Sequence, residues 1–314
     1  MAIDRYQIES CKRIFDERYR HFIHQTPLCK LPGRALGVDC AEIWLKLEHL
    51  QTGGSFKARG MLNRLLSNPI PPSGVIVASG GNAGIATAAA AKELGVPCEV
   101  FVPEISSPAK RARLASLGAR VVVGGATYAD ALQACLARQQ ETGALLTHAY
   151  DQPEVLVGAG TMALEIEAQG GLPGSVLVSV GGGGLIGGVA SWFGQRSRVV
   201  ALEPEQAPSL FRAREAGRPV DVEVGGIAAD SLGARRIGSL AWDVTQSHVR
   251  DALLLTDESI REAQLWLWKE LKLAVEPAAA LPLAALHSRR YVPRANENVC
   301  LIICGANVDP ASLN

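Results

Sequence analysis

Short apolar runs alternate with longer helical segments along most of the chain. The run GVIVAS, from residue 74, precedes NAGIATAAAAKELG, which is alanine-rich and ends at a glycine, as helices commonly do. The same order returns at CEVFVP, at ARVVVG and at LLTHAY, each of which precedes a segment of helical composition. Each unit predicts a strand and a covering helix, and repeated units of this kind are typical of parallel sheets in α/β proteins.

A second series of strands and helices follows. It begins at SVLVSVGGGG and continues through SRVVALEPE, the helical DESIREAQLWLWKELKL, the alanine-rich segment 277–289 and the strand VCLIICG. We therefore expect two parallel sheets with helices on both faces. Because no long linker separates the two series, we expect two domains that share an interface, with a ligand crevice between them.

The composition limits the choice of ligand. The 314 residues include 31 basic and 31 acidic side chains, so a net charge of zero gives no electrostatic reason to expect nucleic acid or an anionic membrane as partner. A small neutral or zwitterionic ligand fits better. The amino terminus lacks the apolar core of a signal peptide, and the seven scattered cysteines are typical of reduced, mostly buried thiols. We expect a cytoplasmic protein.

Four consecutive glycines, Gly181, Gly182, Gly183 and Gly184, stand between an apolar strand and a predicted helix. Backbone N–H groups without side chains around them can approach an anion closely, and a helix amino terminus adds favourable partial charge. The loop therefore predicts a phosphate site. The loop lacks the Lys-Ser/Thr ending of a nucleotide P-loop, and it matches the dinucleotide-binding fingerprint only loosely. A tight turn without a ligand remains the alternative.

A second turn of this kind is ASGGNAG, residues 78–84, where Ser79 and Asn82 add side-chain donors. Such a turn can hold a carboxylate, although an ordinary helix cap has the same sequence features. The segment GGSFKARG then supplies an amine, Lys57, near the start of a predicted helix with Ser55 as its N-cap. A lysine on a helix is usually solvated. Phosphate, carboxylate and amine sites together are, however, what a pyridoxal phosphate enzyme acting on an amino acid needs.

Five motifs in this order, LQTGGSFKARG, SGGNAG, SVGGGGLIGG, EPAAA and CGANVD, make the chain resemble the fold type II pyridoxal phosphate enzymes. It is most similar to the serine/threonine dehydratases, over nearly its whole length. The resemblance implies a tryptophan synthase β-like fold and a homodimer. We expect a large cofactor-binding domain from residues 1–50 and 151–314 and a small domain from 51–150.

The resemblance also implies roles for particular residues. Lys57 would carry the cofactor as a Schiff base, and burial would depress its pKa. Glu276 would lie near the cofactor or cap the helix that Pro277 starts. The remaining cofactor contacts would be Phe56 on the ring, Asn82 on its phenolic oxygen, Gly181 to Gly184 with the Leu185 amide on the phosphate, Cys304 at the pyridine nitrogen and Gly305 along the ring.

By the same resemblance, the substrate would lie against Ser79, Gly80, Gly81, Asn82 and Ala83. A thiol such as Cys304 cannot keep the pyridine nitrogen protonated, so a carbanion at Cα would be short-lived and elimination of a β-hydroxyl would win. Lys57 would remove the Cα proton. The expected reaction converts L-serine or L-threonine into the 2-oxo acid and ammonia.

Two glycines depart from the family pattern. Gly80 stands where serine racemases carry a proton-donating serine, so we predict a lyase rather than a racemase. Gly53 stands where threonine is common. Gly53 and Gly80 together allow a wider pocket, which keeps a bulkier substrate such as 3-hydroxyaspartate or phenylserine open as an alternative.

Glu203, Ala207 and Ser209 match a spacing that supplies a cation site in some relatives. Because Ser209 replaces an aspartate, the pattern favours potassium over magnesium, with a surface turn as the alternative. The long dehydratases that make isoleucine precursors carry a carboxy-terminal regulatory domain, whereas this sequence reaches residue 314 soon after CGANVD, so we expect a degradative role without feedback by isoleucine. The sequence leaves open a serine racemase, a β-replacement enzyme of the cysteine synthase kind, a nicotinamide dehydrogenase, and a catalytically silent protein that binds pyridoxal phosphate.

Overall fold

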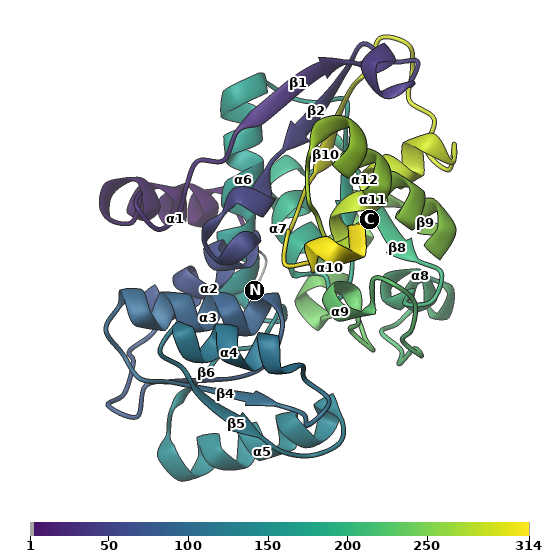
Figure 1. Ribbon diagram of the computed structural model, residues 1–314. Helices are drawn as coiled ribbons and strands as arrows, with labels where there is room; N and C mark the ends of the chain where they lie inside the picture. Colours follow the sequence, from purple (N-terminus) through teal and green to yellow (C-terminus); the bar gives the residue numbers. More distant parts are fainter. Residues whose placement is uncertain (1–2, 314) are drawn as a thin grey trace.

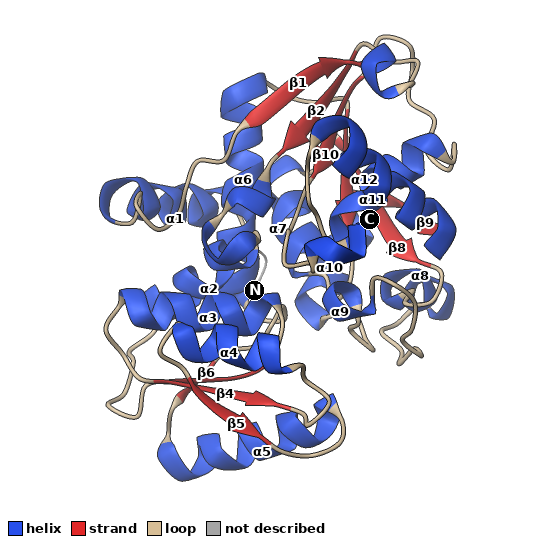
Figure 2. Cartoon of the chain, viewed as in Figure 1, coloured by secondary structure: helices blue, strands red, loops and turns tan. Residues whose placement is uncertain are grey.

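The computed structural model describes residues 3–313, which form two sheets in different parts of the molecule, both covered by helices (Figures 1 and 2). The larger sheet has six strands in the order β1-β2-β10-β7-β8-β9. Its strands are β1 (Leu28–Pro32), β2 (Glu42–Lys46), β7 (Ser175–Ser179), β8 (Arg198–Pro204), β9 (Val249–Leu255) and β10 (Asn298–Ile302). The smaller sheet has four strands in the order β5-β4-β3-β6. These are β3 (Val75–Ala78), β4 (Cys98–Val102), β5 (Arg120–Val123) and β6 (Leu145–Leu146).

The smaller sheet is parallel throughout, as predicted, but the larger one is mixed. Strand β1 pairs antiparallel with β2, because the short turn between them, which contains η1 (Gly33–Leu36), cannot make the crossover that a parallel pair requires. All seven predicted strands are present, although LLTHAY contributes only Leu145–Leu146. The prediction missed β1, β2 and β9.

Helices surround both sheets, and the predicted ones are present. They are α1 (Arg5–Arg18), α2 (Lys57–Leu66), α3 (Asn82–Glu93), α4 (Pro108–Ser116), α5 (Tyr128–Thr142), α6 (Pro153–Gly170), α7 (Gly184–Phe193), α8 (Ser209–Ala216), α9 (Ala229–Leu232), α10 (Ser239–His248), α11 (Asp257–Leu271) and α12 (Pro277–His287). Three short 3-10 turns complete the elements, namely η2 (Glu48–Leu50), η3 (Thr52–Gly54) and η4 (Pro310–Leu313). The smaller sheet and its helices lie within the predicted small domain, whose boundaries stay a prediction.

Helices α2 and α6 pack closely because glycines face each other where they cross. A Cβ added to Gly158 would come within 2.4 Å of the Arg59 carbonyl oxygen, and one on Gly60 would come within 2.8 Å of the Val155 carbonyl oxygen. Any larger side chain would separate the two backbones. The close contact therefore fixes α2, the helix that starts at Lys57, against α6.

Four charged side chains with 1% exposure or less form one cluster on α2 and the segments that pack against it. We name this cluster the buried quartet: Lys46, Glu48, Arg59 and Glu165. The Arg59 guanidinium donates to both oxygens of Glu48, at 2.7 and 2.8 Å, and to both oxygens of Glu165, at 2.8 Å each. Lys46 Nζ also donates to Glu165, at 2.8 Å. The quartet ties β2, η2, α2 and α6 together.

Five of the seven cysteines are buried and all seven are free thiols, in agreement with the prediction. Among the helices of residues 3–313, none is long and apolar enough to cross a membrane.

Candidate functional site

Three segments far apart in the sequence meet at the carboxyl ends of β7 and β10. Ser55 forms a β-bridge with Gly305, the Phe56 N–H donates to the Cys304 carbonyl at 3.0 Å, and the Ala306 N–H donates to the Gly54 carbonyl at 2.9 Å. These contacts hold the segment before α2 along the end of β10. They bring Lys57 and Cys304, 247 positions apart in the sequence, into one site.

A small cavity joins the predicted residues. Its lining includes ten of them, namely Phe56, Lys57, Asn82, Gly181, Gly182, Gly183, Gly184, Leu185, Glu276 and Cys304. It also includes five that the prediction missed, namely Tyr150, Ser179, Ser231, Leu232 and Ala278. Ser179 and Ala278 lie within the motifs SVGGGGLIGG and EPAAA, although neither was singled out there. Tyr150, Ser231 and Leu232 lie in none of the five motifs, and they reach the cavity only because the fold brings their segments together.

Lys57 is half-buried, and burial lowers its pKa to about 8, against the opposing influence of Cys304 and Glu276. This confirms the predicted depression. Its Nζ donates to the Ala149 carbonyl at 2.6 Å and lies 5.2 Å from the centre of the Phe56 ring. The amine therefore lies at the site, with a pKa closer to physiological pH than that of an exposed lysine.

The predicted helix cap was wrong. Helix α2 begins at Lys57, its N-cap position is Phe56, and no side chain caps it. Ser55 is extended, and its buried hydroxyl has no hydrogen-bond partner within residues 3–313. The bridge to Gly305 takes this backbone out of the geometry that a cap needs. Ser55 instead leaves an unpaired polar atom beside the cavity-lining residues.

The glycine loop, Gly181–Gly184, is packed so tightly that side chains are excluded. An added Cβ would come within 2.9 Å of Leu232 at Gly181, within 2.2 Å of the Tyr150 ring at Gly182 and within 2.4 Å of Ala241 at Gly183. Gly183 also has a φ of 91°, which favours glycine. Helix α7 starts at Gly184, so its unpaired first-turn N–H groups continue the loop and favour an anion.

Asn82, the first residue of α3, is held from two sides. Its Nδ2 donates to both oxygens of Glu276, at 2.8 and 3.1 Å, and its Oδ1 accepts from Asn307 Nδ2 at 2.6 Å. Glu276 occupies the N-cap position of α12, but its side chain does not cap that helix. The sequence left two roles open for Glu276, a cap on α12 or a place near the cofactor. The side chain does not cap α12, and it lies beside Asn82 at the site. Burial raises the pKa of Glu276 to about 7.

The remaining residues of the predicted substrate turn lie outside the cavity lining. Ser79 Oγ accepts from the Gly81 N–H at 3.3 Å, and the Ala83 side chain packs in a small apolar cluster with Met61. A Cβ on Gly80 would meet Val102 and the Ser106 hydroxyl, both at 3.3 Å. Neither Gly80 nor Gly53 lines the cavity, and Gly53, with a φ of 73°, makes a left-handed turn. Their lack of side chains therefore does not widen this cavity.

Cys304 is buried at the end of β10. Burial, reinforced by the carboxylate of Glu276, raises the pKa of its thiol well above the usual value. The thiol stays uncharged. Gly305 follows it and packs under Glu276, because an added Cβ would overlap the carboxylate. This end of β10 thus presents a neutral thiol and bare backbone to its surroundings.

The predicted cation residues meet near the glycine loop but are not at the surface. Glu203, Ala207 and Ser209 each have 0% exposure, so the surface-turn alternative is wrong. Burial raises the pKa of Glu203 to about 7. Within residues 3–313, no group of three or more His, Cys, Asp and Glu side chains is arranged to hold a metal ion.

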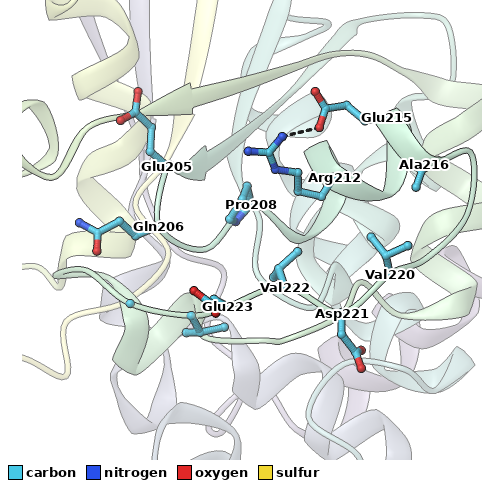
Figure 3. A pocket seen from close by; sticks show the side chains of 12 residues that line it. Glu205, Gln206, Pro208, Arg212, Glu215, Ala216, Val220, Asp221, Val222 and Glu223 are labelled. Atoms are coloured by element: carbon cyan, nitrogen blue, oxygen red, sulfur yellow. Dashed lines mark hydrogen bonds and ion pairs between the residues drawn. The ribbon is translucent and has the colours of Figure 1, made fainter.

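A second, larger cavity of about 750 Å³ lies beside β8 and α8 (Figure 3). Four carboxylates and Arg212 are among its lining residues, and Arg212 pairs with Glu215 at 2.5 Å. Its lining consists of Glu205, Gln206, Pro208, Arg212, Glu215, Ala216, Val220, Asp221, Val222, Glu223, Val224 and Gly225. It contains neither Lys57 nor the glycine loop, so its size does not make it the catalytic cavity.

Comparison with known proteins agrees with this geometry. The family model described as "Pyridoxal-phosphate dependent enzyme" matches residues 19–305. The chain belongs to this family of pyridoxal phosphate-dependent enzymes. Within it, the chain is a fold type II member of the serine/threonine dehydratase group.

Three similar proteins illustrate the group. An L-threonine ammonia-lyase of Geobacter sulfurreducens is 35% identical over 306 residues, which cover 95% of this chain and 75% of the relative. A phenylserine dehydratase of Ralstonia pickettii is 32% identical over 94% of this chain and 91% of its own length. A solved structure of maize serine racemase has a TM-score of 0.92 and 28% identity, and the match covers 100% of this chain and 96% of the racemase.

The residues fit pyridoxal phosphate. The glycine loop is a cradle that side chains would fill, the amine of Lys57 has a lowered pKa, and the thiol of Cys304 is uncharged. An anion site and an amine are what the phosphate and the aldehyde require, and a neutral thiol is compatible with an uncharged ring nitrogen.

Proposed function

We propose that the protein is an ammonia-lyase that converts a β-hydroxy amino acid, L-serine or L-threonine, into the 2-oxo acid and ammonia. The observation that carries this proposal is the lysine with a pKa of about 8 that lines one cavity with the glycine loop and the uncharged Cys304. The threonine ammonia-lyase among the relatives supports the same reaction.

Pyridoxal phosphate, when bound, supplies an electron sink that acidifies the Cα–H of an amino acid. The N–H groups of Gly181–Gly184 and Leu185 would hold its phosphate, and Phe56 and Gly305 would flank its ring. Asn82 would bind the phenolic oxygen. Cys304 would face the pyridine nitrogen without charging it, which would favour elimination over longer-lived carbanion chemistry.

Lys57 acts as the base. Its neutral amine accepts the Cα proton, the Cα–H electron pair forms the Cα=Cβ bond, and the Cβ–O bond breaks with its pair on oxygen. The hydroxyl takes a proton, in net terms the one that Lys57 accepted from Cα, and leaves as water. Hydrolysis of the released enamine consumes one water and gives ammonia and the 2-oxo acid, so the overall reaction balances. The turn before α3 and the first residues of that helix hold the substrate carboxylate through backbone N–H and hydroxyl donors. These residues are Ser79, Gly80, Gly81, Asn82 and Ala83.

The test uses the purified protein and a substrate panel. Borohydride should fix the cofactor on Lys57, as seen by absorbance and peptide mass, and 2-oxo acid should then be measured with L-serine, L-threonine, phenylserine and 3-hydroxyaspartate. A reduced adduct without 2-oxo acid release from any of them would favour the silent binding protein. The absence of an adduct at Lys57 would overturn the proposal.

The size of the substrate side chain is a separate question, because the phenylserine dehydratase among the relatives favours a bulky group. The substrate with the highest kcat/KM within the panel identifies the preferred side chain. D-serine formed from L-serine as fast as pyruvate would instead indicate a racemase, the activity for which the maize structure is named. We also propose a homodimer, which sedimentation or light scattering would test.

A further inference from the structure

Asn307 joins two turns at the edge of the site. Its Nδ2 donates to the Gly53 carbonyl oxygen at 2.8 Å and to Asn82 Oδ1 at 2.6 Å. In the sequence, Gly53 stands four residues before Lys57. Asn307 itself stands three residues after Cys304. One exposed amide therefore connects the segments that carry the lysine, the asparagine of α3 and the thiol.

Donors and acceptors can follow only one order along these contacts. A backbone carbonyl accepts and cannot donate, so Gly53 requires Asn307 to present its Nδ2 rather than its Oδ1. That Nδ2 requires the Oδ1 of Asn82, because two NH₂ groups cannot accept from each other. Asn82 therefore turns its own Nδ2 to Glu276, to which it donates at 2.8 and 3.1 Å. The direction of the Asn82 amide is thus set by a carbonyl outside the cavity lining.

Glu276 by itself would not impose this direction. Burial raises the pKa of Glu276 to about 7, so its carboxyl can hold a proton near neutral pH. A carboxylate only accepts, whereas a carboxylic acid can also donate to an amide oxygen. A reversed Asn82 amide would therefore still find a partner in protonated Glu276. Asn307 excludes the reversed amide, because its Nδ2 would then face the Nδ2 of Asn82.

Gly54 provides the space that Asn307 occupies. A Cβ at Gly54 would lie 2.8 Å from Asn307 Oδ1 and 3.3 Å from its Cγ. Gly54 also has a φ of 80°, which favours glycine. The Ala306 N–H donates to the Gly54 carbonyl at 2.9 Å and fixes the backbone immediately before Asn307. The second glycine before Ser55 thus allows this asparagine to reach both of its acceptors.

We propose that Asn307 is a positioning residue that holds the Asn82 amide with its Nδ2 on the side of the cavity, directed to the phenolic oxygen of the cofactor. This inference rests on the proposed role of Asn82 in binding pyridoxal phosphate. Asn82 and Glu276 line the cavity and Asn307 does not, so Asn307 acts through Asn82. A reversed amide would bring Asn82 Oδ1 against the phenolic oxygen, where two acceptors repel.

Affinity for pyridoxal phosphate, measured by absorbance titration of the cofactor-free protein, tests this role. Because Asn307 is exposed, Asn307→Ala removes no core contact. It should bind the cofactor about fivefold more weakly, since losing one such hydrogen bond costs about 1 kcal/mol. Asn307→Asp should bind more weakly still, because a carboxylate cannot donate to Gly53 or Asn82. Asn296→Asp, at an exposed asparagine before β10, is the matched control and should equal wild type. Unchanged affinity in Asn307→Ala would overturn the role.

A double-mutant cycle shows whether Asn307 acts through Asn82. In an Asn82→Ala background, adding Asn307→Ala should cause no further loss of affinity, because the amide that Asn307 positions is absent. An equal loss with and without Asn82 would overturn the inference, since Asn307 would then act independently.

The spectrum of the Schiff base at Lys57 separates this role from a loss of packing. An N–H donated to the phenolic oxygen stabilises its anionic form, which absorbs in the visible, over the neutral form, which absorbs in the near ultraviolet. At equal saturation and pH, Asn307→Ala should therefore show a smaller share of visible absorbance than wild type. Looser packing would admit water, favour the charged form and shift the spectrum the opposite way. An unchanged or opposite shift would contradict the inference.

These measurements do not depend on turnover. Wild type that binds the cofactor without releasing 2-oxo acid would contradict the proposed function and leave the role of Asn307 standing. A failure of wild type to bind pyridoxal phosphate would overturn both.

Discussion

Two strand-to-helix turns meet at the site, and they are held in different ways. The glycine loop, Gly181–Gly184, has three successive carbonyls bonded to donors and close contacts on every side. The turn of residues 79–82 has one carbonyl fixed in this way, that of Gly81, which accepts from the Ile85 N–H at 3.0 Å, and one internal bond, from Gly81 to Ser79. The side chain of Asn82 joins it to Glu276 and Asn307. A turn fixed by its backbone suits a permanent cofactor, whereas one held by exchangeable side-chain bonds can respond to a substrate.

Removal of the base between the two turns should have the largest effect. We expect Lys57→Ala to lower kcat for 2-oxo acid release by about 10³-fold or more, because it removes both the cofactor link and the proton acceptor. Lys269→Ala, an exposed lysine on α11, is the matched control and should keep its activity. Retained turnover in Lys57→Ala would place the chemistry elsewhere.

Adding one methyl group to each turn tests the comparison directly. In Gly182→Ala the methyl would overlap the Tyr150 ring, and an overpacking cost of about 1–3 kcal/mol should weaken cofactor binding by about 10- to 100-fold. In Gly81→Ala the nearest atom lies at 3.6 Å, so cofactor affinity should persist while KM changes. Both constants come from absorbance titration and initial rates. Equal losses of affinity in the two variants would remove the contrast.

The burial of Glu276 should make stability depend on pH. Burial raises the pKa of Glu276 from 4.5 to about 7, so between those values the folded protein holds a proton that the unfolded chain has released. Stability from this group is full below pH 4.5 and falls as pH rises toward 7, by about 1.4 kcal/mol per pH unit at most. Urea unfolding of cofactor-free Glu276→Gln should show a shallower fall than wild type, and Glu258→Gln, an exposed carboxylate, should match wild type.

The smallest effect is expected from restoring a hydroxyl to the second turn. A Cβ at Gly80 would need to displace Val102 or Ser106 by a few tenths of an ångström. We expect Gly80→Ser to form some D-serine from L-serine, more slowly than pyruvate, as measured by chiral chromatography. A complete lack of D-serine, with pyruvate release intact, would mean that this position does not reach Cα.

The sequence predicted the parts of the site that depend on local chemistry. The glycine loop and Lys57 are recognisable because bare backbone after a strand and an amine at a helix start have few other uses together. Tyr150 and Asn307 were missed because their roles come from packing between distant segments, against Gly182 and Asn82. The neighbours of Tyr150 in sequence give no sign of it, whereas Asn307 lies within the motif CGANVD, where it could have been considered.

The same limit explains the errors in the fold. Strands β1 and β9 are edge strands with partly exposed residues, so they lack the continuous apolar run that made the inner strands visible. The cation residues show a related limit, because their spacing predicts oxygens near one another, whereas only the fold shows that the Ser209 hydroxyl also reaches the Gly181 carbonyl.

The buried quartet has a practical consequence for mutational scanning. Neutralising one member leaves an unpaired charge in the interior and costs about 3–5 kcal/mol, whereas replacing all members by apolar residues of similar volume is often tolerated. In a screen scored by activity, Lys46, Glu48, Arg59 and Glu165 would therefore be as intolerant as Lys57, although none of them lines the cavity. Scoring soluble protein beside turnover would separate them, because loss of the quartet lowers both and loss of Lys57 lowers turnover alone.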